Sequence, residues 1–262
     1  MDLGITGRCA LVTAASKGLG LASARALAAE GCRVIVSSRG GAALEAAAAS
    51  VRDETGAEVV AIAADVSERD DLERLVRAAG ERFGGVDILV TNTGGPAPGT
   101  FAADESAWEA GVDNTLMNVV RLCRLCLPRM RQNGWGRIVD ITSVSVKQPI
   151  GNLVISNSVR AAVHGLSKTM ATEFGSDGVL VNCVCPGLHL TDRLRELAEV
   201  RGKANGRDPE EELAAMEASV PVGRLGDPAD FASVVAFLCS ERARFVTGTS
   251  VLVDGGATHG VT

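Results

Sequence analysis

The sequence contains no tyrosine. A phenol hydroxyl therefore cannot serve as the proton donor in any reaction that this chain catalyses. Histidine, the side chain best suited to proton transfer near neutral pH, occurs only three times, and aromatic residues make up 3% of the chain. A reaction site in this protein that needs a proton donor must use some other group.

Basic residues are outnumbered by acidic ones. The chain has 26 lysines and arginines against 32 aspartates and glutamates, which gives a net charge of −6. This balance argues against nucleic acid or an anionic membrane as the main partner. We expect a small soluble molecule instead.

Long uncharged runs are missing as well. No uncharged stretch of about 18 residues is present, so no membrane-spanning helix is expected. Residues 1–8, MDLGITGR, lack the basic and apolar regions of an export signal. The seven cysteines are odd in number and irregularly spaced, which favours a reducing, cytoplasmic location without disulfides. No metal site is expected, because the pair Cys123 and Cys126 has no second pair of ligands.

Short β-branched runs alternate with longer helical stretches along the chain. With 46% hydrophobic residues among 262, this alternation predicts one α/β domain over residues 1–262. Its fold is expected to be a Rossmann-like, doubly wound parallel sheet with helices on both faces. We expect strands at residues 9–13, 33–37, 59–63, 88–92, 137–143, 179–185 and 250–253, and helices at 18–30, 41–55, 68–83, 105–132, 152–174 and after 228.

Two expected helix starts carry capping signals. Asp227 followed by Pro228 suits the cap and first position of a helix, and Ser67 with Asp70 suits a capping box. Residues 191–224 form a charged segment that is longer than an ordinary connection. Such segments commonly close over bound substrates, so a substrate lid is predicted there.

The first strand leads into a glycine-containing turn that opens a helix, residues 13–20 with the sequence TAASKGLG. In a βαβ unit the unpaired N–H groups of such a helix start face a bound phosphate, and the missing side chains of Gly18 and Gly20 let it approach. The alternative is a tight turn without a ligand, but the position within a βαβ unit favours a nucleotide. The predicted cofactor-binding residues of this turn are Thr13, Ser16, Lys17, Gly18, Leu19 and Gly20.

The end of the second strand indicates which dinucleotide is bound. Ser38 and Arg39 stand where an enzyme for NAD places a carboxylate. Arg39, together with Lys17, can neutralise a 2′-phosphate instead, so NADP(H) is predicted over NAD(H). The alternative is that both are solvated surface charges. Asp65 and Asn92 follow the third and fourth strands at the same edge, where open sheets bind ligands.

Taken together, these residues resemble the short-chain dehydrogenase/reductase family, and most closely its 3-oxoacyl-[acyl-carrier-protein] reductase-like members. The resemblance covers nearly the whole chain. The segments that carry it are 87–94 (DILVTNTG), 136–139 (GRIV), 186–191 (PGLHLT), 221–226 (PVGRLG) and 253–256 (VDGG). It implies an oxidoreductase that forms a homotetramer or homodimer through its two long helices. It also implies cofactor contacts from Val66, Gly94, Arg160, Pro186, Gly187 and Thr191.

The sequence departs from this family where the catalytic residues fall. The family's serine is kept as Ser143, but its asparagine falls on Thr115, its tyrosine on Ser156 and its lysine on Arg160. Serine is a much weaker acid than tyrosine and a much shorter side chain, so it is not a simple replacement. Arg160, with a pKa expected above about 12, supplies charge and donors but does not release a proton. The glycine-rich loop also differs, because Ala14 stands where the family has glycine.

Three functions remain open at this point. The first is an atypical NADP(H)-dependent oxidoreductase: Ser143 and Ser156 hydrogen-bond the substrate oxygen, Arg160 stabilises the developing alkoxide, and water or a substrate group supplies the proton. The second is a non-redox isomerase, lyase or cyclase in which Arg160 binds an anionic group. The third is a nucleotide-binding protein without catalysis. His189, in the loop after the sixth strand, is a further candidate proton donor.

Overall fold

Seven parallel strands form one sheet in the computed structural model, which describes residues 2–260. Their spatial order is β3-β2-β1-β4-β5-β6-β7, so the direction of winding reverses between β1 and β4. In such sheets the crevice at the carboxyl ends of the strands beside this reversal is the usual ligand site. The strands are β1 (Cys9–Thr13), β2 (Arg33–Ser38), β3 (Val59–Ala63), β4 (Ile88–Thr91), β5 (Gly136–Ile141), β6 (Val179–Pro186) and β7 (Ser250–Val253).

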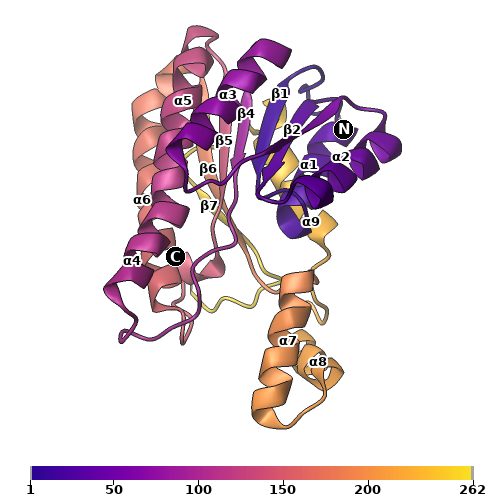
Figure 1. Ribbon diagram of the computed structural model, residues 1–262, viewed down its shortest axis with the longest axis vertical. Helices are drawn as coiled ribbons and strands as arrows, with labels where there is room; N and C mark the ends of the chain where they lie inside the picture. The colour runs from indigo at the N-terminus through magenta and orange to yellow at the C-terminus, as the bar shows by residue number, and fades with distance from the viewer. Residues whose placement is uncertain (1, 261–262) are drawn as a thin grey trace.

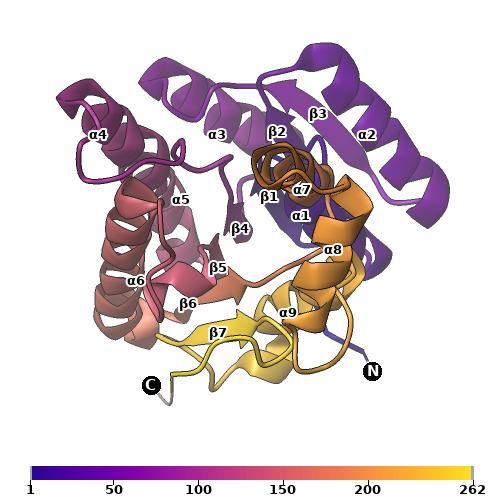
Figure 2. The ribbon, with the colours of Figure 1, turned by 90° about the horizontal axis from the view of Figure 1, so that it is seen from below.

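Helices cover both faces of the sheet (Figure 2). One face carries α1 (Gly18–Ala29), α2 (Gly41–Thr55) and α9 (Pro228–Leu238). The other carries α3 (Arg69–Phe83), α5 (Asn118–Gln132) and α6 (Val154–Phe174). The doubly wound, Rossmann-like fold expected from the sequence is therefore confirmed.

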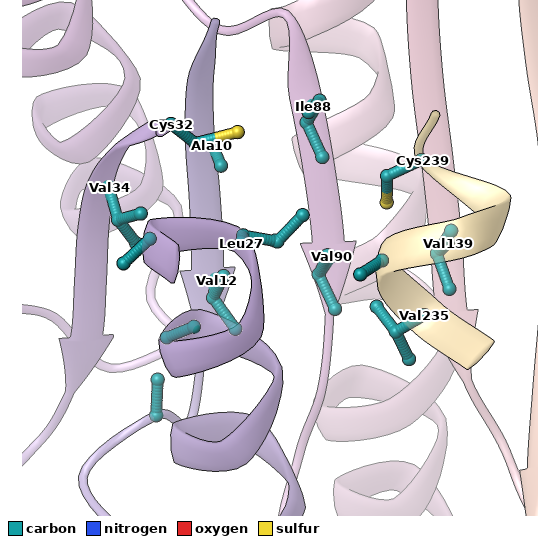
Figure 3. Packing of buried hydrophobic residues seen from close by; sticks show 14 of the residues in the cluster. Ala10, Val12, Leu27, Cys32, Val34, Ile88, Val90, Val139, Val235 and Cys239 are labelled. Atoms are coloured by element: carbon teal, nitrogen blue, oxygen red, sulfur yellow. The ribbon is translucent and has the colours of Figure 1, made fainter. Parts of the chain in front are cut away.

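The central strands are buried on both sides, which explains their continuous β-branched sequences. Val12, Val90 and Val139 of neighbouring strands point to one face, where Leu27 of α1 and Val235 of α9 cover them (Figure 3). All seven cysteines lie in the described part of the chain, are buried and form no disulfide there. Cys126 packs as a small apolar group in the core, as expected, and this burial raises the pKa of its thiol to about 12.

One capping prediction is confirmed and the other is wrong. Asp227 caps α9, its side chain accepts from the N–H of Ala229 at 2.7 Å, and Pro228 takes the first helical position. At α3 the cap is Glu68, without a side-chain hydrogen bond. The hydroxyl of Ser67 donates instead to Asp65 Oδ1 at 2.7 Å, so it is not available to the helix.

The long helix expected at 105–132 is present but interrupted. It consists of α4 (Glu105–Val112), a π-helical turn at Asp113–Met117, and α5. A π-helical turn inserts one extra residue and is frequent at functional sites. This one carries Thr115.

The segment expected to be a lid folds into two helices, α7 (Asp192–Asn205) and α8 (Pro209–Ala218). They pack on each other through their own apolar cluster, which includes Leu194 and Met216. In Figure 1 this helical hairpin projects from the carboxyl-end side of the sheet, away from the main body. None of the helices between residues 2 and 260 combines the length and apolar character needed to cross a membrane.

Candidate active site

The glycine-rich turn between β1 and α1 is tied to the end of β4. Thr13 Oγ1 donates to the carbonyl of Asn92 at 2.9 Å and accepts from its N–H at 2.8 Å. A Cβ added to Gly20 would lie 2.5 Å from the carbonyl oxygen of Ala14, so only glycine fits there. Ala14 itself has a φ of 46°, a left-handed conformation that costs an alanine about 1–2 kcal/mol. The loop thus keeps the shape of a glycine-rich turn despite the methyl group.

The start of α1 has no side-chain cap that would compete with an anion. Lys17 makes no side-chain cap, and no acidic residue occupies the first turn of the helix. Ser16 is half-buried in the turn, while Leu19 packs against the core and can offer a ligand only its backbone. A Cβ added to Gly18 would lie 3.7 Å from Cγ2 of Thr191, so the loop after β6 closes over this turn.

The basic pair predicted from the sequence, Lys17 and Arg39, follows the carboxyl ends of β1 and β2. Lys17 already forms ion pairs with carboxylates of the chain. Its ammonium is 3.5 Å from a carboxylate oxygen of Glu196 and 4.0 Å from one of Asp192, both on α7. All three side chains are well exposed, so these ion pairs contribute little to stability. Arg39 is exposed. The Oγ of Ser38 is buried without a hydrogen-bond partner among residues 2–260.

Asp65 and Val66 follow β3 at the same edge. Asp65 Oδ1 accepts from the N–H and the hydroxyl of Ser67, at 3.0 and 2.7 Å, and these bonds lower the pKa of the carboxyl. Val66 packs its side chain against the core. At the end of β6, Pro186 leads to Gly187, where a Cβ would lie 2.6 Å from Cβ of Asp254.

Arg160 of α6 hydrogen-bonds Ser156 of the same helix and the backbone at the end of β5, which leads directly to Ser143. Ser143 caps the short 3₁₀ helix Val144–Val146, accepting from the N–H of Ser145 at 3.1 Å. Nε of Arg160 donates to Oγ of Ser156 at 3.2 Å. Nη1 of Arg160 donates to the carbonyl of Thr142 at 2.6 Å and to that of Ile141 at 3.2 Å. The guanidinium is thereby fixed beside the backbone that presents Ser143.

Arg160 is 8% exposed and forms no ion pair within residues 2–260. Burial, with a smaller contribution from the nearby Arg193, lowers the pKa of Arg160 to about 10. The surroundings of Arg160 thus shift its pKa below the ordinary arginine value expected from the sequence, and the group remains protonated at neutral pH.

Thr115 lies in the same cavity as Arg160. Its Oγ1 is buried and has no hydrogen-bond partner in the described chain. It lines a cavity of about 10 Å³ together with Asn92, Thr142 and Arg160. This volume is close to the smallest that admits one water molecule. Thr115, Arg160 and Asn92, the residue that follows β4, therefore line the same cavity.

Two residues of this region were not identified from the sequence. Arg193, on α7, donates a hydrogen bond from Nη1 to the carbonyl of Gly94. Asp140 of β5 is fully buried and accepts from Thr91 Oγ1 and Ser167 Oγ, each at 2.6 Å. Neither belongs to a motif, and only the fold shows that they border the site.

His189 lies outside this cluster. It is 5% exposed and packs edge-on against Phe231, with ring centroids 5.5 Å apart. It lines a second cavity, of about 230 Å³, whose lining shares no residue with the cavity at Thr115. His189 thus lines a different cavity from Arg160 and Thr115, and its suggested role as a proton donor stays a prediction.

Comparison with known proteins gives matches over almost the full chain. The family model described as Enoyl-(Acyl carrier protein) reductase matches residues 13–258. Dehydrogenase/reductase SDR family member 4 of Bos taurus is 36% identical over 252 residues, covering 95% of this chain and 87% of the relative. The 3-oxoacyl-[acyl-carrier-protein] reductase FabG of Vibrio cholerae is 36% identical over 257 residues, covering 97% and 98%.

Solved structures also match over almost the full chain. L-sorbose reductase from Gluconobacter frateurii, complexed with NADPH and L-sorbose, superposes with a TM-score of 0.96 at 36% identity over 100% of both chains. Actinorhodin polyketide ketoreductase with NADPH has a TM-score of 0.92 at 34% identity, covering 97% of this chain and 98% of the other. The sheet order, the glycine-rich turn and these matches lead to one conclusion: the chain belongs to the short-chain dehydrogenase/reductase family.

Proposed function

We propose that this protein is an NADP(H)-dependent oxidoreductase that acts on a carbonyl or hydroxyl group of a small organic or acyl substrate without a phenolic proton donor. One observation carries the proposal. The Arg160 guanidinium, which is hydrogen-bonded to Ser156 and Thr142, lines the same cavity as Asn92 at the end of β4. The reductases among the relatives, and the NADPH present in two structural neighbours, support it.

The residues that follow β1 and β2 fit a phosphorylated dinucleotide. Gly18 and Gly20 keep the turn after β1 free of side chains, and the uncapped start of α1 offers its N–H groups to a pyrophosphate. The unpartnered hydroxyl of Ser38, with Arg39 and Lys17, suits a 2′-phosphate. NADPH held there supplies a hydride to the substrate carbonyl.

The chain's own residues then handle the oxygen of the substrate. The hydroxyls of Ser143 and Ser156 hydrogen-bond this oxygen, and Arg160 stabilises the negative charge that develops on it. One well-placed donor of this kind contributes roughly 2.7–4 kcal/mol in other enzymes. Because Arg160 keeps its proton at neutral pH, the proton for the alkoxide comes from water, for which the cavity at Thr115 offers a place.

A non-redox reaction on an anionic substrate is the second candidate. It is favoured by the replacement of the family's proton donor by Ser156 and of its lysine by a guanidinium. The two candidates differ in what they consume. An isomerase, lyase or cyclase converts its substrate without oxidising NADPH.

We also propose self-association and a cytoplasmic location. Leu116, in the π-helical turn before α5, and Leu166, in α6, are only partly buried within the chain, and these are the helices predicted to pair. Val119 and Met170 are buried in the core, so they do not contribute to such an interface. Light scattering after size-exclusion chromatography tests the association, and the mass of one chain, 27.0 kDa, would refute it.

The activity is tested by following NADPH absorbance with a panel of ketones, keto acids and acyl thioesters. We expect at least one class to be reduced by the wild type and not by Arg160→Met. Lys168→Met, a charge loss at an exposed position of the same helix, is the control and should retain the activity. Conversion of a substrate without NADPH consumption would support the non-redox candidate instead.

A further inference from the structure

Lys17, one of the two basic residues predicted to bind the 2′-phosphate, forms ion pairs with the helical hairpin. Its ammonium lies 3.5 Å from a carboxylate oxygen of Glu196 and 4.0 Å from one of Asp192. These two residues stand one turn apart on α7, so both negative charges face the same ammonium. Arg39, the other predicted phosphate ligand, forms no ion pair within residues 2–260. Of the two, only Lys17 is therefore shared with another part of the chain.

Lys17 and Arg39 follow two strands that are tied together at their ends. The N–H of Ala15, in the turn after β1, donates to the carbonyl of Ser37 in β2 at 3.0 Å. Lys17 and Arg39 each stand two residues beyond this contact. The lysine ammonium sits on a flexible four-carbon stem, so it can turn from α7 toward a phosphate held by Arg39. A phosphate at this position and the carboxylates of α7 would then compete for one ammonium.

The hairpin does not need Lys17 in order to fold. Its two helices share an apolar cluster that includes Leu194 and Met216, and the hairpin projects from the main body (Figure 1). The hydrogen bond from Arg193 to the carbonyl of Gly94 is a separate tie between α7 and the main body. Loss of the Lys17 ion pairs should therefore loosen the start of α7 and leave the hairpin folded.

We propose that Asp192 and Glu196 tune the selectivity of the protein for its cofactor, because they compete with the 2′-phosphate of NADP(H) for Lys17. NAD(H) carries no phosphate at this position, so its binding leaves the ion pairs intact. The two carboxylates therefore weaken the binding of NADP(H) and not that of NAD(H). This inference rests on the proposed function, in which Lys17 and Arg39 bind the 2′-phosphate.

The competition acts in both directions. If the ion pairs lower the affinity for NADP(H), bound NADP(H) must weaken the ion pairs by the same factor. An exposed ion pair of this kind changes an equilibrium by at most about fivefold. The carboxylates of α7 thus reduce the preference for NADP(H) without reversing it. The phosphorylated cofactor in turn loosens the start of α7, and the unphosphorylated cofactor does not.

Calorimetric titration of the nucleotide-free protein with NADPH and with NADH tests this competition without turnover. At low ionic strength, where exposed charges are least screened, Glu196→Gln should tighten the binding of NADPH about twofold to fivefold. The affinity for NADH should not change. Glu199→Gln is the matched control, because it removes the same charge from an exposed position of α7 that does not pair with Lys17. It should alter neither affinity.

Two further measurements separate competition for Lys17 from a general change in α7. In a Lys17→Met background, Glu196→Gln should change the affinity for NADPH by less than about twofold, because the shared ammonium is gone. Hydrogen exchange is the second readout. Amides at the start of α7 should exchange faster in the NADPH complex than in the NADH complex, and Glu196→Gln should remove this difference. Equal exchange in the two wild-type complexes would contradict the competition.

Other results would also overturn the inference. If the wild type binds NADPH and Glu196→Gln binds it equally well, the carboxylate does not compete, and the proposed function stands. Equal gains in Glu196→Gln and Glu199→Gln would assign the effect to the net charge of α7. Equal gains for NADPH and NADH would assign it to the pyrophosphate that both cofactors share. An undiminished gain in the Lys17→Met background would exclude Lys17 as the link. Binding of neither nucleotide by the wild type would contradict the proposed function and this inference with it.

Discussion

Nε of Arg160 donates a hydrogen bond to Oγ of Ser156 across one turn of α6, at 3.2 Å. These two residues stand at the spacing where related reductases have a tyrosine and a lysine. Here they form a connected pair in which the hydroxyl accepts from a fixed cation and can donate its own hydrogen to a substrate oxygen. Under the proposed function this pair polarises a carbonyl and supplies no acidic proton.

Ser156→Ala removes that donor and should lower kcat roughly 100-fold, the usual effect of losing one oxyanion donor. Stability should fall by about 1–2 kcal/mol, because Nε of Arg160 loses its acceptor. Ser158→Ala is the matched control, since Ser158 is exposed and its hydroxyl bonds only to the backbone of its own helix, at Val154. Equal kcat values for the two variants would remove Ser156 from the site.

Ala14→Gly should stabilise the protein by roughly 0.5–1 kcal/mol. Ala14 is held at a φ of 46°, a conformation that glycine adopts without steric cost. The gain is partly offset by the greater freedom of glycine in the unfolded chain. Urea unfolding measures the difference, with Ala15→Gly as the control. Ala15 is fully buried without a positive φ, so its variant should lose stability. A loss in both variants would contradict the account of this turn.

Asp140→Asn should raise the free energy of unfolding at pH 7 by about 1 kcal/mol, which corresponds to roughly 2–4 °C in Tm for a domain near this size. Burial raises the pKa of Asp140, although hydrogen bonds from Ser167 and Thr91 oppose the shift. An acid with a raised folded-state pKa loses stability as the pH rises from its ordinary value, about 3.9, through the folded-state value. The variant lacks this loss, so the difference should vanish in acid. A less stable variant at pH 7 would show that the charged carboxylate is favourable there.

Stability should decline as the pH falls below about 6.5, and His189 should account for part of the decline. Burial lowers the pKa of His189 in the folded chain. As the pH falls, His189 therefore becomes protonated in the unfolded chain before it does so in the folded chain. One such group contributes at most about 1.4 kcal/mol per pH unit. Urea unfolding at several pH values should give a shallower slope for His189→Gln than for the wild type. Some slope remains, because the pKa of His164 is lowered in the same way. Identical slopes would exclude His189 as a contributor.

The fold was predictable because each strand is continuous and β-branched and each helix has a sided pattern. The details that could not be predicted depend on local contacts in the folded chain. Ser67 could cap a helix or hydrogen-bond Asp65, and only the folded loop shows that its hydroxyl donates to Asp65. The charged segment at 191–224 was expected as a lid, but its two helices depend on contacts such as that between Leu194 and Met216.

At the candidate site, Ser143, Ser156 and Arg160 could be proposed from the sequence because their spacing matches that of the family. It did not reveal Arg193, which lies on the hairpin and reaches Gly94 only after the chain has folded back over a distance of almost 100 residues. Nor did it reveal that Lys17 pairs with carboxylates of α7. Contacts of this kind depend on tertiary structure and leave no local pattern.

The proposed function requires that the chain binds NADP(H) for a redox reaction. The most direct test is a fluorescence titration of the nucleotide-free protein with NADPH and, in parallel, with NADH. We expect tight binding of NADPH, weak binding of NADH, and a loss of this preference in Arg39→Ala, because the 2′-phosphate then loses its guanidinium partner. Absence of binding of either nucleotide up to millimolar concentration would contradict the account and point to a cofactor-independent site at Ser143, Ser156 and Arg160.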